Sequence, residues 1–290
     1  MDPTESLLPM AILTLILITG VLLLVVAIGI GVEPGWPWLL HRRPWLAFRA
    51  MASMYVGPPA VVWLLVRILP LDGPVSAALL GLAISPVLPP WGRKAALVGG
   101  RSNDIIGLQL LSSGIAVLVI PLMIWLVEHL FKVQTTLDPL AVELVLLVTV
   151  AAPLAVGMGL AHWAPGAAPR LAALADRTGS VLLLIGGVLL IVLRGPSILG
   201  VMGQGTLLAI AAVVIFGLLL GHVLGGPDPR TRGVLASATV YRHPAIALIL
   251  ASGSGKQPGD AVIGTVLLYM LVSLLLSSPY ERWRQRVIGS

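Results

Sequence analysis

Hydrophobic residues fill this chain in long blocks that short polar segments separate. Nine blocks approach or exceed the roughly 20 apolar residues that a helix needs to cross a bilayer. They lie near residues 7–31, 46–69, 75–112, 113–131, 139–161, 178–193, 204–224, 231–253 and 261–278. Residues 181–193 show none of the alternation of apolar and polar positions that β-barrel strands require. The pattern predicts an all-α polytopic membrane protein with about nine transmembrane helices.

The composition agrees with this prediction. Of the 290 residues, 58% are hydrophobic and 10% are charged, whereas a soluble domain carries about 25% charged residues. The formal net charge is +6, but the basic residues lie in short loops between apolar blocks. They therefore indicate membrane topology, and we expect no nucleic-acid partner. The chain has no cysteine, which excludes disulfides, thiolate metal sites and cysteine catalysis.

Charges at the ends of the blocks predict the orientation. If the C-terminus faces the cytoplasm, an odd number of spans places the N-terminus outside. The cytoplasmic loops then hold ten arginines: Arg42, Arg43, Arg49, Arg170, Arg177, Arg230, Arg232, Arg282, Arg284 and Arg286. The opposite ends hold only Arg67, Lys132, Arg194 and Lys256. This asymmetry follows the positive-inside rule. The preference for Arg over Lys, the absence of Cys and the compact loops indicate a multi-pass protein of a bacterial cytoplasmic (inner) cell membrane.

The third block is too long for a simple span. As one straight helix, residues 73–111 would measure about 57 Å at 1.5 Å per residue. Proline removes a backbone donor and clashes with the preceding turn, and paired glycines permit a tight turn. The expected breaks are Pro86, Pro89, Pro90, Gly99 and Gly100. We therefore predict two half-helices joined by irregular backbone, which at membrane depth needs protein or a watered cavity to satisfy its polar groups.

The eighth block is also interrupted, because Arg242, His243 and Pro244 lie at its centre. An arginine at the bilayer midplane costs about 2.5–3.5 kcal/mol on insertion scales, so it faces a partner or a cavity. Pro74 and Pro89 have the same spacing as Pro229 and Pro244. Interrupted segments at matching places in two halves are typical of inverted-repeat secondary transporters.

Three segments resemble the bile acid:sodium symporter family. They are RTRGVLASATVYRHPAIALILA at 230–251, SPVLPP at 85–90 and GGRSND at 99–104. The longest polar stretch, at 162–177, is a connector within a single membrane domain over residues 1–290, with a first half at 1–161 and a second half at 178–290. The resemblance implies a core with two crossing broken helices, near 46–131 and 204–278. The remaining helices, near 7–31, 139–161 and 178–193, would form a panel.

The chain departs from this family where sodium would bind. The sodium-coupled members carry a Glu, a Gln and an Asn where this chain has Ala238, Arg242 and His243. Only Ser102 and Asn103 match the sodium-site pattern. A fixed cation repels sodium strongly in a low-dielectric site. We therefore do not expect classical sodium coupling, and a proton and sodium both stay open as the coupling ion.

A region that combines half-helix N-termini with Arg242 would attract an anion, and a guanidinium binds carboxylate or sulfonate through two hydrogen bonds. The hypothesis is a secondary-active transporter of a small organic anion, bile-acid-like or a carboxylate, that works by alternating access. Arg242 would anchor the substrate or replace sodium; alternatively it forms a structural ion pair with Asp104. His243 titrates in the physiological range and could couple a proton.

The other candidate residues keep two interpretations each. Asp104 either pairs with Arg101, Arg242 or Lys94, or it carries a proton. Asn103 either binds substrate or cation, or it caps freed backbone. We expect Gln109, Ser112 and Ser113 to serve packing and backbone bonding.

An enzyme is not expected. An aspartyl intramembrane protease needs two membrane aspartates, and only Asp104 lies deep in a predicted span. The HExxH motif of metalloproteases is absent, and so is a GxSxG elbow within a span. We expect no cofactor and no bound metal, and the expected partners are the organic anion and the lipid bilayer. The alternative function is a membrane sensor, a scaffold or a channel-like protein of the same fold.

Overall fold

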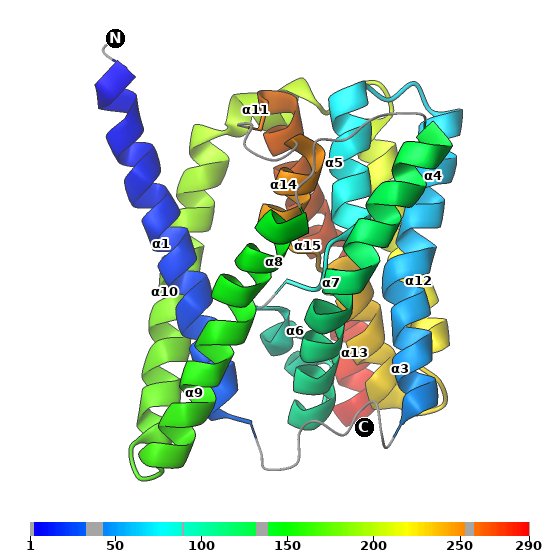
Figure 1. Cartoon of the computed structure of the whole chain (residues 1–290). Helices are drawn as coiled ribbons and strands as arrows, with labels where there is room; N and C mark the ends of the chain where they lie inside the picture. The colour runs from blue at the N-terminus through cyan, green and yellow to red at the C-terminus, as the bar shows by residue number, and fades with distance from the viewer. Residues whose placement is uncertain (1–2, 33–42, 89, 132–138, 253–257, 290) are drawn as a thin grey trace. The chain divides into compact units, whose positions relative to one another are not determined.

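The computed structural model describes residues 3–32, 43–88, 90–131, 139–252 and 258–289. Within these residues the chain forms helices and no strand, as Figure 1 shows. The helices before residue 132 are α1 (Pro3–Ile30), α3 (Pro44–Met51), η2 (Ala52–Val56), α4 (Gly57–Ile68), α5 (Gly73–Ile84), α6 (Trp91–Leu97) and α7 (Ser102–Phe131). Those after it are α8 (Pro139–Leu146), η3 (Leu147–Ala151), α9 (Ala152–Trp163), α10 (Ala168–Leu193), α11 (Gly195–Gly200), α12 (Thr206–Leu224), α13 (Pro229–Val240), α14 (Pro244–Ser252) and α15 (Asp260–Gly289).

Six stretches of the described residues are long and apolar enough to cross a membrane. They are Ala11–Ile30, Pro44–Ile68, Leu144–Trp163, Ala168–Leu193, Thr206–Leu224 and Asp260–Ile288. Two further apolar helices, Gly73–Ile84 and Asp104–Ala116, are shorter. This is the architecture of an all-α membrane protein, and the prediction of fold class is confirmed at that level.

The chain forms two compact units. Unit 1 contains residues 1–33 and 146–195, and unit 2 contains residues 34–145 and 196–290. In unit 1, α1 packs against α9 and α10. Glycine lets the helix backbones meet, because a Cβ at Gly29 would collide with the Leu154 carbonyl and one at Gly157 with the Val26 carbonyl. Small residues at such contacts are what helices use to associate in lipid.

In unit 2, two interrupted helices pack against each other. The first consists of α5 and α6, and the second of α13 and α14. The α5 half packs against α14, and the α6 half packs against α13. In Figure 1, α5 and α14 accordingly lie in the upper part of the unit and α6 and α13 in the lower part. The two interruptions therefore meet between these pairs.

Two sequence-based boundaries are wrong. The predicted boundary between residues 112 and 113 does not exist, because α7 runs unbroken from Ser102 to Phe131. The predicted connector at 162–177 is mostly helical, because α10 begins at Ala168 with a proline in its first turn, where the missing amide hydrogen costs nothing. Hydropathy marks where a chain prefers lipid, and the real break, between the end of α9 at Trp163 and the start of α10 at Ala168, is much shorter than the predicted connector.

Candidate functional site

The candidate site is the point where the two interruptions cross. Helix α5 ends before Ser85 and α13 ends before Tyr241, and both of these residues have extended backbone. Val87 and Arg242 then form an antiparallel bridge. Its hydrogen bonds run from the Leu88 amide to the Tyr241 carbonyl, at 3.1 Å, and from the His243 amide to the Pro86 carbonyl, at 2.9 Å.

Proline explains why the chain is extended at this crossing. Ser85 precedes Pro86 and His243 precedes Pro244, and a residue before proline is pushed out of the helical region. Pro86 also has no amide hydrogen to donate to a preceding turn. The freed backbone groups of each interruption find partners on the other one.

Side chains of α7 form hydrogen bonds with further backbone groups of the first interruption. The Val87 amide donates to the Ser112 hydroxyl at 3.1 Å, and the Gln109 side-chain amide donates to the Val87 carbonyl at 3.1 Å. The Trp91 indole donates in turn to the Gln109 carbonyl oxygen at 2.6 Å. Gln109 and Ser112 therefore perform the backbone bonding expected of them, and they rebuild in protein the hydrogen bonds that lipid cannot supply.

Arg242 lies inside the crossing and is 2% exposed. Its Nη1 donates to the Ser85 carbonyl at 3.0 Å, and its Nη2 donates to the Met54 carbonyl at 2.6 Å. The Met54 carbonyl needs this partner because Pro58, four residues later, has no amide hydrogen to complete the helical bond. The guanidinium thus links α5, η2 and the second interruption through backbone oxygens.

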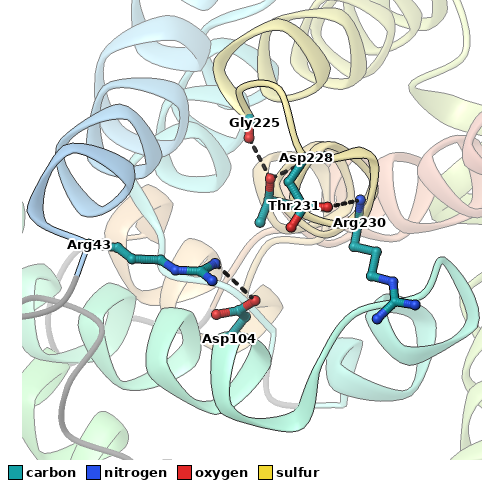
Figure 2. A network of polar contacts seen from close by, with 6 residues as sticks. All are labelled: Arg43, Asp104, Gly225, Asp228, Arg230 and Thr231. Carbon is teal, nitrogen blue, oxygen red and sulfur yellow. Dashed lines mark hydrogen bonds and ion pairs between the residues drawn. The ribbon is translucent and has the colours of Figure 1, made fainter.

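Among the described residues, no carboxylate pairs with Arg242. The alternative interpretation, a structural ion pair between Arg242 and Asp104, is therefore wrong. Asp104 instead lies 3.6 Å from the Arg43 guanidinium, and Figure 2 shows these two side chains pointing toward each other. Asp104 occupies the first turn of α7, where a carboxylate complements the helix dipole, so it sits at a helix end and away from the crossing.

The remaining predicted residues are dispersed. His243 is buried, at 4% exposure, and lies at the crossing. Gly99 has a φ of +82° in the turn between α6 and α7, and Arg101 is exposed beyond Gly100. Pro90 precedes α6 as its N-cap. Pro89 and the side chains of Ser102 and Asn103 lie outside the described residues.

Sequence reasoning missed a buried carboxylate. Glu281 in α15 is 4% exposed, and it accepts hydrogen bonds from the Tyr241 hydroxyl at 2.7 Å and from Lys94 Nζ at 3.0 Å. The segment around Glu281 was interpreted as a cytoplasmic end because it carries three arginines. Helical spacing is the signal that could have found it, because one face of α15 carries polar residues that are all buried. They are Ser273, Ser277, Glu281 and Arg284.

The crossing is therefore a closed region that holds one buried guanidinium among backbone carbonyls, with a buried carboxylate attached through Tyr241. Within the described residues, no group of three or more His, Asp and Glu side chains could hold a metal ion. No protein-family model matches this chain, and no curated protein is significantly similar to it, so a functional proposal rests on these residues.

Proposed function

We propose that this protein is a secondary-active transporter that moves a small organic anion across a cell membrane by alternating access, without classical sodium coupling. One observation carries the proposal. A guanidinium donates to two backbone carbonyls at the crossing of two interrupted membrane helices, the place where transporters of this architecture bind their ions. The built-in cation replaces a transported one.

The role of Arg242 follows from the oxygens around it. Unwound backbone carbonyls are the ligands that hold sodium in discontinuous transporter helices. Here the carbonyls of Ser85 and Met54 already accept from Arg242. A sodium ion at the same place would meet a fixed positive charge in a low-dielectric region, which is strongly repulsive. Because Nη1 and Nη2 each donate to a backbone carbonyl, we assign Arg242 the role of sodium replacement, and its charge attracts the substrate anion. Its buried Nε atom has no hydrogen-bond partner among the described residues.

Matching features of the two interrupted helices support inverted repeats, and the nine spans predicted from hydropathy stay a prediction. Helices α5 and α13 each have 12 residues, each follows an aspartate at the N-cap, and each has a proline in the first turn. The N-cap residues are Asp72 and Asp228. Matching interruptions of this kind point to a binding site between two repeats.

The division into two units supports a core and a panel, as in the bile acid:sodium symporter family that the sequence resembles. Unit 1 gathers residues 1–33 and 146–195, and unit 2 holds both interrupted helices. We infer that unit 2 is the core that contains the substrate path. Several arginines lie at the loop between α12 and α13 or at the first residue of α13, namely Arg43, Arg49, Arg232 and Arg284. We call this the basic end, and we propose that it faces the cytoplasm.

Counterflow in proteoliposomes tests the proposal. Vesicles are loaded with unlabelled substrate from a panel of bile acids and small carboxylates, and uptake of the labelled compound is measured in sodium and in choline buffers. We expect uptake of at least one anion, equal in both buffers. Uptake that requires sodium would contradict the role given to Arg242, and a complete lack of uptake by folded protein would contradict transport.

The matched variants are Arg242→Met and Arg286→Met. Arg286 is exposed in the last turn of α15, so its loss controls for the removal of one charge and one long side chain. We expect Arg242→Met to abolish counterflow and Arg286→Met to retain it. Size-exclusion chromatography establishes that both variants are monodisperse before flux is compared.

A scaffold or sensor of the same fold is the second candidate. The burial of Arg242 and the bonding of both its Nη atoms favour it, because the crossing is closed by internal partners. Counterflow separates these functions. A carrier concentrates label against unlabelled substrate, a channel lets label equilibrate without concentrating it, and a scaffold shows neither behaviour.

A further inference from the structure

A cavity of about 360 Å³ opens at the basic end of unit 2. Its lining comes from the start of α3 and from the loop that joins α12 to α13. The lining includes Arg43, Trp45, Arg49, Gly225, Asp228 and Thr231. Two candidate membrane spans, Pro44–Ile68 and Thr206–Leu224, end at this cavity. The cavity therefore lies at the level where the hydrocarbon core gives way to lipid headgroups.

The cavity carries two arginines. Arg43 has a side chain that is 43% exposed, and its guanidinium stays 3.6 Å from Asp104, which is longer than a hydrogen bond. Arg49 has a buried Nε atom without a hydrogen-bond partner among the described residues. A guanidinium offers a planar set of donors that matches two oxygens of a phosphate. Both side chains line the cavity, so both guanidiniums can donate to an anion bound there.

The Arg49 guanidinium lies against Gly226, where only glycine leaves room for it. This glycine has a φ of +81°, and a Cβ on it would lie 2.7 and 2.8 Å from the two Nη atoms of Arg49. The Gly226 carbonyl also accepts a hydrogen bond from Arg232 Nε at 2.5 Å. The positive charge of Arg232 therefore lies close to the loop that lines the cavity.

The carboxylate that lines the cavity, Asp228, already accepts a hydrogen bond from the backbone of α13. Asp228 caps α13, and its Oδ1 accepts the Arg230 amide at 2.9 Å, as Figure 2 shows. Thr231 donates to the Gly225 carbonyl in the same figure, which ties the loop to the first turn of α13. At the start of α3, by contrast, no side chain caps the helix. The positive end of α3, at Trp45 and Leu46, therefore faces the cavity without a carboxylate of its own.

Aromatic side chains beside the cavity favour a lipid over a soluble anion. Trp45 lines the cavity and is 65% exposed, and Phe48 is 62% exposed. Their rings stack with centroids 5.4 Å apart. Exposed aromatic rings at the end of a span are typical of the membrane interface. A lipid anion fits this arrangement, because its headgroup can reach the two arginines while its acyl chains lie beside these rings, along α3 and α4.

From these contacts we propose that the cavity binds the headgroup phosphate of an anionic phospholipid. The phosphate oxygens accept from Arg43 and Arg49 and face the uncapped start of α3, while the acyl chains pass Trp45 and Phe48. The lipid then ties α3 to the loop between α12 and α13. This site is separate from the crossing, and it does not depend on the transport proposal.

Lipid titration followed by native mass spectrometry tests the site. The full chain in detergent is titrated with short-chain phosphatidylglycerol, with short-chain phosphatidylcholine and with inorganic phosphate. We expect saturable binding of one phosphatidylglycerol, at least tenfold tighter than phosphatidylcholine. Equal binding of the two lipids would overturn the proposal. Displacement of phosphatidylglycerol by millimolar inorganic phosphate would assign the cavity to a free anion and would also overturn it.

Variants locate the bound lipid. An arginine near the membrane surface contributes enough that its loss weakens binding of an anionic lipid about fivefold. We expect this loss for Arg43→Gln and Arg49→Gln, and no change for the exposed control Arg286→Gln. An equal loss in Arg286→Gln would indicate general surface charge and would sink the proposal.

A gain-of-binding variant removes misfolding as an explanation. Asp228→Asn deletes the one carboxylate that lines the cavity, and asparagine caps a helix as well as aspartate does. We expect phosphatidylglycerol to bind about fivefold more tightly, because a like charge near the phosphate is gone. Unchanged or weaker binding by folded Asp228→Asn would show that the phosphate does not occupy this cavity.

Discussion

Replacing Arg242 should destabilise the fold through the backbone and not through the loss of an ion pair. Its guanidinium satisfies the carbonyls of Ser85 and Met54, which are buried within the crossing. Each carbonyl left without a donor costs about 1–3 kcal/mol, so the two together cost about 2–6 kcal/mol. Removing a buried charge recovers part of its desolvation penalty. We therefore expect Arg242→Met to lose about 2–4 kcal/mol of unfolding free energy.

Two variants separate the hydrogen bonds from the volume. Arg242→Met fills most of the space and removes only the donors, whereas Arg242→Ala also leaves a cavity. We expect the alanine variant to be the less stable of the two, because an unfilled cavity adds its own cost. Unfolding is followed by circular dichroism as SDS is titrated into protein in mixed micelles, with the exposed Arg286→Met as the control.

The reasoning fails if Arg242→Met unfolds within about 0.5 kcal/mol of the parent, the range of an ordinary surface substitution. That result would mean that the two carbonyls find other partners without the guanidinium. Addition of millimolar methylguanidinium to Arg242→Ala gives a second check. A small cation that refills the site should raise stability with its concentration, because it binds only the folded state.

Three further perturbations test the rest of the fold by the same SDS titration. Glu281→Gln should lower the free energy of unfolding by about 1–3 kcal/mol. This is below the usual cost of breaking a buried ion pair, because Lys94 is partly exposed. Adding Lys94→Met to the same chain should restore part of the lost stability. Ser112→Ala should lose about 1–3 kcal/mol because the buried Val87 amide loses its acceptor. Gly157→Val should lose about 1–3 kcal/mol or more, because its Cβ collides with the backbone of α1.

Each of these variants has an outcome that would contradict its premise. If the Glu281→Gln and Lys94→Met losses simply add, the two groups do not interact in solution. A stable Ser112→Ala chain would show that water or another side chain reaches the first interruption. A Gly157→Val chain as stable as the parent would show that α1 and α9 do not pack closely within unit 1.

Local chemistry in the sequence was sufficient for the helices and for their interruptions. Long apolar blocks predicted an all-helical membrane protein, which the described residues confirm. Pro86 and Pro244 act through their own missing amide hydrogens and on the residues just before them, so no distant neighbour is needed to break the chain there. Hydropathy failed at residues 112 and 113, where α7 continues, because polar residues can stay helical when another segment bonds to them.

The partner of each buried charge was decided by the tertiary structure alone. Arg242 bonds to the Met54 carbonyl, 188 residues away, and Glu281 bonds to Lys94, 187 residues away. The sequence states that a charge in an apolar segment must be compensated, since an isolated one is too costly. The sequence does not identify the compensating group, because that group depends on which helices pack together. Here the packing supplies backbone carbonyls to Arg242, and it places Asp104, in the first turn of α7, beside Arg43 at the N-cap of α3.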